Sequence, residues 1–213
     1  MSRPNYRPIH TLSIADSPLP DSSLLHFWEW AFGDLCDDDI KGIFAEWMIL
    51  KLLGIASTRR ISWANCDIVT PERVRIEVKT SSRWQSWKLL DGAGKPYDPP
   101  LYPATEDAKI RFSGLMARDA TTIADSSATP EFKSDIYVFA FQKEWAPERW
   151  NAVDLLQWEF YVLPAKRIKE IGLNSISLKR LRAEQNPMTA AEFVAKARIL
   201  IEEAALETRA QSK

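Results

Sequence analysis

The sequence predicts a single domain of the α/β (α+β) class, in which a mixed β-sheet is flanked by helices. Its 213 residues are enough for one domain with a full hydrophobic core. Apolar residues recur at helical spacing early in the chain, then alternate or run together as in strands, and return to helical spacing near the end. An order of helix, hairpin, further strands and helices favours a mixed sheet covered by helices.

The N-terminal residues 1–20 contain four prolines and little periodicity, so an irregular arm is expected there, before a domain over 21–207. Asp21, Ser22 and Ser23 are good N-cap residues. The apolar residues that follow predict a first helix that stops at Gly33.

A second helix is predicted from Asp39 to Leu53. The acidic residues 37–39 suit the positive end of its dipole, and Gly54 suits its end. Glu46 falls within this helix.

A hairpin is predicted next, with one arm over residues 65–69 and the other over 73–79, because the turn between them, 70–72, is short. Further along, the patterns predict a weaker strand over 108–113, strands over 135–142 and 157–163, a helix over 165–171, and a last helix that starts at Thr189 with a Thr189–Glu192 capping box. Loops are expected over 91–107 and 120–134, and a frayed tail over 208–213.

Composition excludes several classes of protein. The net charge of -1 gives no overall attraction to nucleic acid or to anionic lipid, so any such attraction has to be local. No apolar run reaches membrane-spanning length, and the N-terminus lacks the apolar core of a signal peptide, so no membrane partner is expected. Cys36 and Cys66 form no metal-type cluster, which favours a reduced, cytoplasmic protein.

Charged residues alternate with apolar ones in the second arm of the hairpin. Glu77 and Lys79 share one face of the strand, while Val78 turns to the other. Alone they would make a surface ion pair worth about 0–1 kcal/mol. Asp67 changes this interpretation, because it lies on the opposite arm of the hairpin, across from the Glu77 region.

Two neighbouring carboxylates repel each other unless a cation separates them. Magnesium prefers oxygen ligands, so the carboxylates of Asp67 and Glu77 with the backbone carbonyl of Val78 could hold it beside water and a phosphate oxygen. Lys79 would then help to hold hydroxide or neutralise charge on phosphorus. The pattern therefore predicts a site that hydrolyses a phosphodiester; the bland alternative is a solvated hairpin.

Asp67, nine further residues and Glu77-Val78-Lys79 resemble the PD-(D/E)xK signature of the restriction-endonuclease-like nuclease superfamily. The stretches IKGIFAEWMILKLLGI, EVKTSSRWQSW, SDIYVFAFQ and QWEFYVLP resemble an uncharacterised bacterial subgroup of it, and the likeness covers roughly residues 22–180. The residue before Asp67 is Cys66 where the signature has proline, at a position that varies in the superfamily.

This resemblance implies a restriction-endonuclease-like core and a cofactor, Mg2+ or Mn2+. Asp67 and Glu77 would bind the metal with the Val78 carbonyl, and Glu46 would reach it directly or through water. Lys79 would assist the attacking water, and Gln85 falls where some relatives place a site glutamine.

Local charge is compatible with a nucleic-acid partner, and the partner expected is DNA. Residues 56–88 hold seven Lys or Arg against three acids, and residues 165–183 hold six against one. Such residues also coat ordinary solvated surfaces, so both interpretations stay open. Trp84 and Trp87 could stack on bases or pack against the sheet. The rival functions are a non-catalytic nucleic-acid-binding module and a protein-interaction subunit, and a homodimer is possible.

Overall fold

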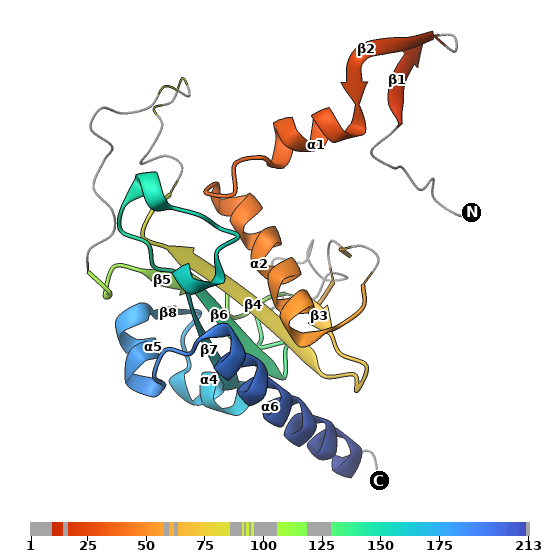
Figure 1. The fold of residues 1–213 in the computed structure, drawn as a ribbon. Coiled ribbons are helices and arrows are strands. Elements are labelled where there is room, and N and C mark those ends of the chain that lie inside the picture. The colour runs from red at the N-terminus through yellow and green to blue at the C-terminus, as the bar shows by residue number, and fades with distance from the viewer. Residues whose placement is uncertain are drawn as a thin grey trace.

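The computed structural model describes residues 10–14, 17–57, 60–61, 64–85, 91, 93, 95, 106–118 and 129–211. Within them the fold is mixed α/β (Figure 1). Its strands are β1 (Thr11–Ile14), β2 (Ser17–Ser23), β3 (Ile68–Val69), β4 (Arg75–Ser82), β5 (Arg111–Ser113), β6 (Ile136–Gln142), β7 (Trp158–Pro164) and β8 (Ser175–Ser177). Its α-helices are α1 (Leu24–Phe32), α2 (Asp38–Leu53), α4 (Ala165–Ile171), α5 (Leu178–Glu184) and α6 (Ala190–Gln211), and two short 3-10 helices span Pro147–Arg149 and Leu155–Gln157.

The central sheet has the strand order β3-β4-β6-β7. Strand β4 runs parallel to β6, while the β3–β4 and β6–β7 pairs are antiparallel, so the sheet is mixed, as predicted. Every side chain of β6 is buried, because both faces of the sheet are covered at its centre.

The side chains of the central strands alternate between two hydrophobic cores. Val138 and Phe160 point into a core shared with α2 and α6, whereas Phe139 and Tyr161 point into a core shared with α4, α5, β5 and β8. Figure 1 shows α2 and α6 in front of the sheet, with α4, α5 and β8 at its lower left. None of the described helices is long and apolar enough to cross a membrane.

Several predicted elements are confirmed. Helix α2 begins one residue earlier than expected, with the Asp37 carboxylate accepting from two backbone N–H groups, and ends at Gly54 in the left-handed conformation at φ 70°. The β3–β4 hairpin and α4 form as predicted. The capping box before α6 is also present, since Glu192 accepts hydrogen bonds from the backbone N–H and the hydroxyl of Thr189.

The prediction of an irregular arm over 1–20 is wrong in the part that the structure describes. Strands β1 and β2 form an antiparallel hairpin, from which α1 follows directly. Pro18 and Pro20 sit in β2, where a two-stranded sheet leaves one side of the strand without ladder partners. Residues 1–9 and 15–16 lie outside the described residues.

Other boundaries differ from the predictions. The first hairpin arm, expected over 65–69, forms ladder pairs only at Ile68 and Val69, while the second extends beyond 79 to Ser82. Strand β8 and helix α5 lack a predicted counterpart, and α6 continues through 208 to Gln211, where fraying was expected. The expected loops over 91–107 and 120–134 lie largely outside the described residues.

Candidate active site

The short length of β3 places the Asp67 side chain at the open edge of β4. The backbone N–H of Asp67 donates to the Ile76 carbonyl at 3.2 Å, which continues the ladder by one bond. Further along β4, a side-chain hydrogen bond replaces the backbone ladder, because Oδ2 of Asp67 accepts from the Val78 N–H at 2.7 Å. Because a strand residue directs its N–H and C=O to the same side, the Val78 carbonyl faces this edge as well. Asp67 therefore lies across from the Glu77 region, as the sequence predicts.

Glu77 and Lys79 project from the face of β4 opposite to Ile76 and Val78. The Lys79 ammonium lies 2.8 Å from Oε1 of Glu77, and both side chains are largely buried. The other oxygen of Glu77 accepts from the Ser134 hydroxyl at 3.2 Å. Glu77 and Lys79 thus form a partly desolvated ion pair with a further hydrogen bond from Ser134, not a loose surface pair.

Glu46 approaches the same edge from α2, and its carboxylate is held by Arg60. The Arg60 side chain donates to both oxygens of Glu46, at 2.5 and 2.7 Å. This pairing raises the pKa of the Arg60 guanidinium. For Glu46 to reach a metal directly, as the resemblance implies, Arg60 would have to release it, so that role remains a prediction.

Negative charge accumulates around Asp67. Burial, the nearby Glu77 carboxylate and the more distant Glu46 carboxylate together raise the pKa of Asp67 to about 7. The Val78 N–H and the Lys79 ammonium act in the opposite direction but do not cancel these effects. Three acidic side chains from α2, the β3 arm and β4 therefore share one region that one arginine and one lysine compensate only in part.

The donor set suits a hard divalent cation. Asp67, Glu77 and the Val78 carbonyl offer oxygen ligands, and Mg2+ and Mn2+ prefer oxygen. Among the described residues, no three His, Cys, Asp or Glu side chains are grouped as a complete metal site. Two carboxylates with several waters are enough for Mg2+, so the residues present fit such an ion.

Gln85 lies beyond the end of β4, three residues after Ser82. Its carboxamide oxygen accepts from the Lys41 ammonium at 2.6 Å, and Lys41 also donates to the Ser82 hydroxyl at 3.0 Å. Lys41 is only 2% exposed, near the start of α2. Gln85 thus satisfies a buried cation in this structure, and its role in catalysis remains a prediction.

Sequence reasoning missed two residues at the site, Arg60 and Ser134, and also the buried Lys41 beside Gln85. Arg60 belongs to the basic stretch 56–88, which was the one signal that could have suggested a cation for Glu46. Ser134 immediately precedes the start of the strong strand prediction at Asp135, but nothing in the sequence links it to Glu77.

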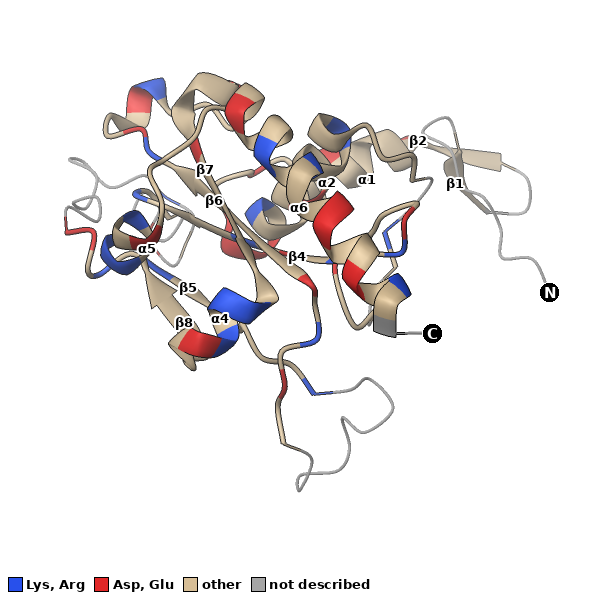
Figure 2. Ribbon diagram, turned by 90° about the horizontal axis from the view of Figure 1, so that it is seen from below, with Lys and Arg blue, Asp and Glu red and all other residues tan. Residues whose placement is uncertain are grey.

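Several Lys and Arg residues of the two basic stretches, 56–88 and 165–183, form ion pairs within the protein. Arg75 pairs with Asp135, and Arg182 pairs with both Asp107 and Glu159. The exposed cations of the second stretch lie on α4 and α5, where Figure 2 shows blue segments: Lys166, Lys169, Lys179 and Arg180. These residues keep a phosphate-binding interpretation open for that surface.

Of the two tryptophans that follow β4, Trp84 and Trp87, the structure describes only Trp84. Trp84 is buried, with its indole N–H donating to the Trp145 carbonyl at 2.8 Å, so it packs and is not an exposed stacking platform. Trp87 lies outside the described residues.

Comparison of the chain with models of protein families, with curated proteins and with solved structures gives no match.

Proposed function

We propose that this protein is a metal-dependent nuclease with a restriction-endonuclease-like core, which hydrolyses phosphodiester bonds in DNA. The observation that carries the proposal is the meeting of Asp67 with the Glu77–Lys79 pair at the open edge of β4, through the hydrogen bond from Val78 to Asp67. A helix with Glu46 beside this edge and a mixed central sheet also agree with it.

Each residue would have a defined role. Asp67, Glu77 and the Val78 carbonyl would hold Mg2+ or Mn2+. When bound, such an ion polarises a phosphoryl oxygen and lowers the pKa of a coordinated water. Lys79, already oriented by Glu77, would donate to the attacking water or to the phosphoryl oxygens as negative charge develops on them. The exposed lysines of α4 and α5 would add contacts to the nucleic-acid backbone.

A cytoplasmic location belongs to the same proposal. Both cysteines are buried free thiols, as expected for a protein kept in a reducing compartment. A role in bacterial defence or in DNA processing would follow from the superfamily resemblance.

The proposal is tested by incubating the purified protein with supercoiled plasmid, linear duplex, single-stranded DNA and RNA, in Mg2+, in Mn2+ and in EDTA. We expect cleavage of at least one DNA substrate with either metal and none in EDTA. If the protein binds DNA but leaves every substrate intact with both metals, it is a non-catalytic binding module.

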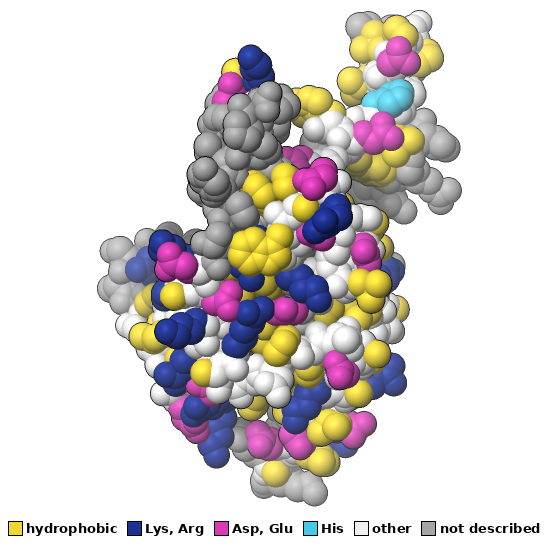
Figure 3. Space-filling view, turned by 60° about the vertical axis from the view of Figure 1, so that its left-hand side comes forward, with side chains coloured by type: hydrophobic (Ala, Val, Ile, Leu, Met, Phe, Trp, Pro, Cys, Tyr) yellow, Lys and Arg dark blue, Asp and Glu magenta, His cyan; other side chains and the backbone are white. Residues whose placement is uncertain are grey.

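A second candidate function, association with a second copy of the chain, is favoured by the N-terminal arm, here the β1–β2 hairpin with α1. Helix α1 carries six large apolar residues, yet none of its residues is buried, and Trp30 is 85% exposed. Figures 1 and 3 show the arm projecting away from the body of the protein, with apolar side chains on its surface. An exposed apolar helix of this kind is typical of an interaction surface.

We expect the full chain to behave as a dimer in light scattering coupled to size-exclusion chromatography, and the Phe27→Ser/Trp30→Ser variant as a monomer. A matched Trp145→Ser variant, altered away from the arm, should remain a dimer. A wild-type chain that is monomeric at all concentrations would rule out this role for the arm.

A further inference from the structure

A pocket of about 390 Å³ lies between α2 and the described residues that follow it before β3, namely 55–57, 60–61, 64 and 66–67. Its walls include four large apolar side chains that are exposed to solvent: Ile43, Trp47, Ile61 and Val69. Its lining also includes Glu46, Arg60 and Asp67, so the pocket is continuous with the candidate active site. A volume of this size is typical of sites that enclose a small organic group.

Trp47 offers a supported aromatic surface in this pocket. Its side chain is 53% exposed, and its ring packs against Phe44, with ring centroids 5.9 Å apart. Phe44 in turn packs against the buried Trp158 at 6.3 Å, which ties the pair to the core. Nucleobases stack on exposed aromatic side chains of this kind, whatever the base sequence.

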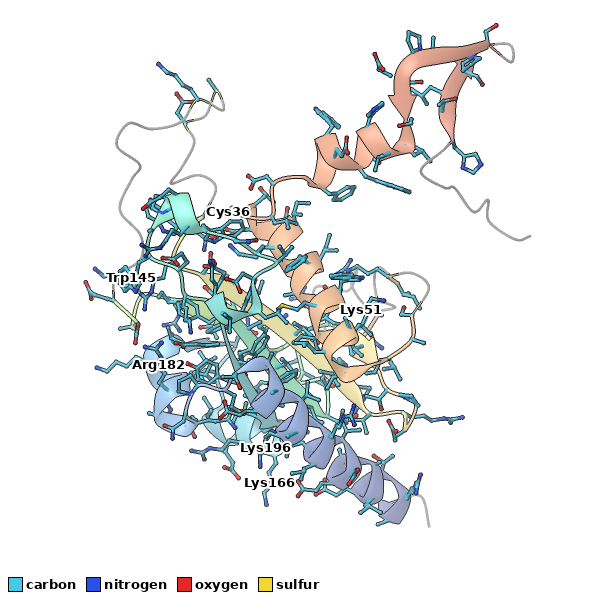
Figure 4. The ribbon with its side chains drawn as sticks, in the orientation of Figure 1. Cys36, Lys51, Trp145, Lys166, Arg182 and Lys196 are labelled. Carbon is cyan, nitrogen blue, oxygen red and sulfur yellow. The ribbon has the colours of Figure 1, made fainter. Side chains whose placement is uncertain are left out.

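The pocket also carries cations. The Lys51 ammonium lies 5.7 Å from the centre of the Trp47 ring, and Figure 4 labels Lys51 on α2. Arg60 also lines the pocket, paired with Glu46. An apolar pocket with cations beside it matches a nucleotide, whose base has flat apolar faces and whose phosphates are negative.

We propose that this pocket binds one unpaired nucleobase of the strand that is cut, stacked on Trp47, with a neighbouring phosphate at Asp67 and Glu77. This inference rests on the proposed function and adds to it the class of substrate. A base held in the pocket cannot pair within a duplex. The preferred substrate is therefore single-stranded, or carries a flap, a frayed end or an extruded base beside the cleaved bond.

A protein side chain or the arm of a second copy would be a less suitable occupant. Either could cover apolar walls, but neither would explain why the pocket is continuous with the acidic site or why it carries Lys51 and Arg60. Those features match the alternation of base and phosphate along a strand.

Binding can be measured without turnover in a Glu77→Gln background, by fluorescence anisotropy of a short single-stranded DNA and of its blunt duplex. We expect the single strand to bind more tightly, and Trp47→Ala to weaken its binding about tenfold, since stacking on one aromatic side chain contributes this much. Trp47→Phe should keep most of the affinity, and the matched control Trp145→Ala, at a half-exposed tryptophan outside this pocket, should keep all of it.

An abasic site placed at each position of the strand in turn provides the second measurement. At one position it should weaken binding to the Glu77→Gln protein as much as Trp47→Ala does, with no further loss when the two changes are combined. Unchanged single-strand affinity in Trp47→Ala would overturn the inference, and so would an abasic series without effect. Conversion of a dimer to a monomer by Trp47→Ala, with no change in DNA affinity, would identify a second copy as the occupant and also overturn it.

These results separate the inference from the proposed function. If the wild-type protein cleaves nothing with Mg2+ or Mn2+ but binds single strands through Trp47, the nuclease is refuted and the base pocket is supported. Cleavage that is equally fast on duplex and single strand, and insensitive to Trp47→Ala, would support the nuclease and refute the base pocket.

Discussion

Glu77→Gln is expected to lower the rate of DNA cleavage by about 10²–10³-fold, a loss of the size that follows removal of one preorganised group that stabilises a transition state. The substitution keeps the shape of the side chain and can still accept from Ser134, but it removes a charge that would hold the metal and that orients Lys79. Lys79→Met should cause a loss of similar size, because it removes the only ammonium group that contacts Glu77 among the described residues. The measurement is the single-turnover rate with saturating Mg2+.

The charge-matched control for Glu77→Gln is Glu106→Gln. Glu106 forms an exposed ion pair with Lys109, so its neutralisation changes the net charge by the same amount as Glu77→Gln without touching the site. This control should cleave at the wild-type rate. Wild-type rates in both Glu77→Gln and Lys79→Met would show that other residues, or a contaminating nuclease, are responsible for cleavage.

Asp67→Asn is expected to stabilise the metal-free protein at neutral and mildly alkaline pH. The folded protein holds the Asp67 pKa at about 7, above its ordinary value of 3.8, so the folded state binds this proton more tightly than the unfolded state does. The contribution of this proton to the free energy of unfolding is fully present at low pH. About 2–4 kcal/mol of it is lost as the pH rises towards about 7. Asparagine can still accept from Val78 without acquiring a charge, so the variant should not show this loss.

The loss can be followed by urea unfolding in EDTA between about pH 5 and about pH 8. Asp135→Asn provides a control of opposite sign. Burial alone would raise the pKa of Asp135, but hydrogen bonds from the side chain and backbone of Arg75 outweigh it and lower the pKa. Ionised Asp135 therefore stabilises the fold, and its replacement should be destabilising at neutral pH. If the free energies of unfolding of the wild type and of Asp67→Asn change in parallel with pH, carboxylates are not crowded around Asp67.

The sequence predicts those parts of the fold that depend on local chemistry. Helix α2 could be delimited because Asp37 caps its start and Gly54 its end. The hairpin could be identified because so short a turn enforces antiparallel pairing, and it placed Asp67 across from Glu77. These features depend on residues that are near one another in the chain.

What the sequence does not predict depends on distant contacts. Arg60 reaches Glu46 from a segment without periodicity, and Ser134 reaches Glu77 across 57 positions. Lys41 has the helical position of a solvated lysine, but the fold buries it against Gln85. The arm hairpin was missed because proline usually excludes a strand, whereas β2 can accommodate it on its unpaired side.

Mn2+ binding, followed by electron paramagnetic resonance, tests most directly whether Asp67 and Glu77 share a metal ion. We expect one bound Mn2+ per chain in the wild type and in the Glu106→Gln control, displaced by excess Mg2+. Asp67→Asn and Glu77→Gln should each weaken binding by at least about tenfold, and the double variant should abolish it. A double variant that binds Mn2+ as tightly as the wild type would contradict the account.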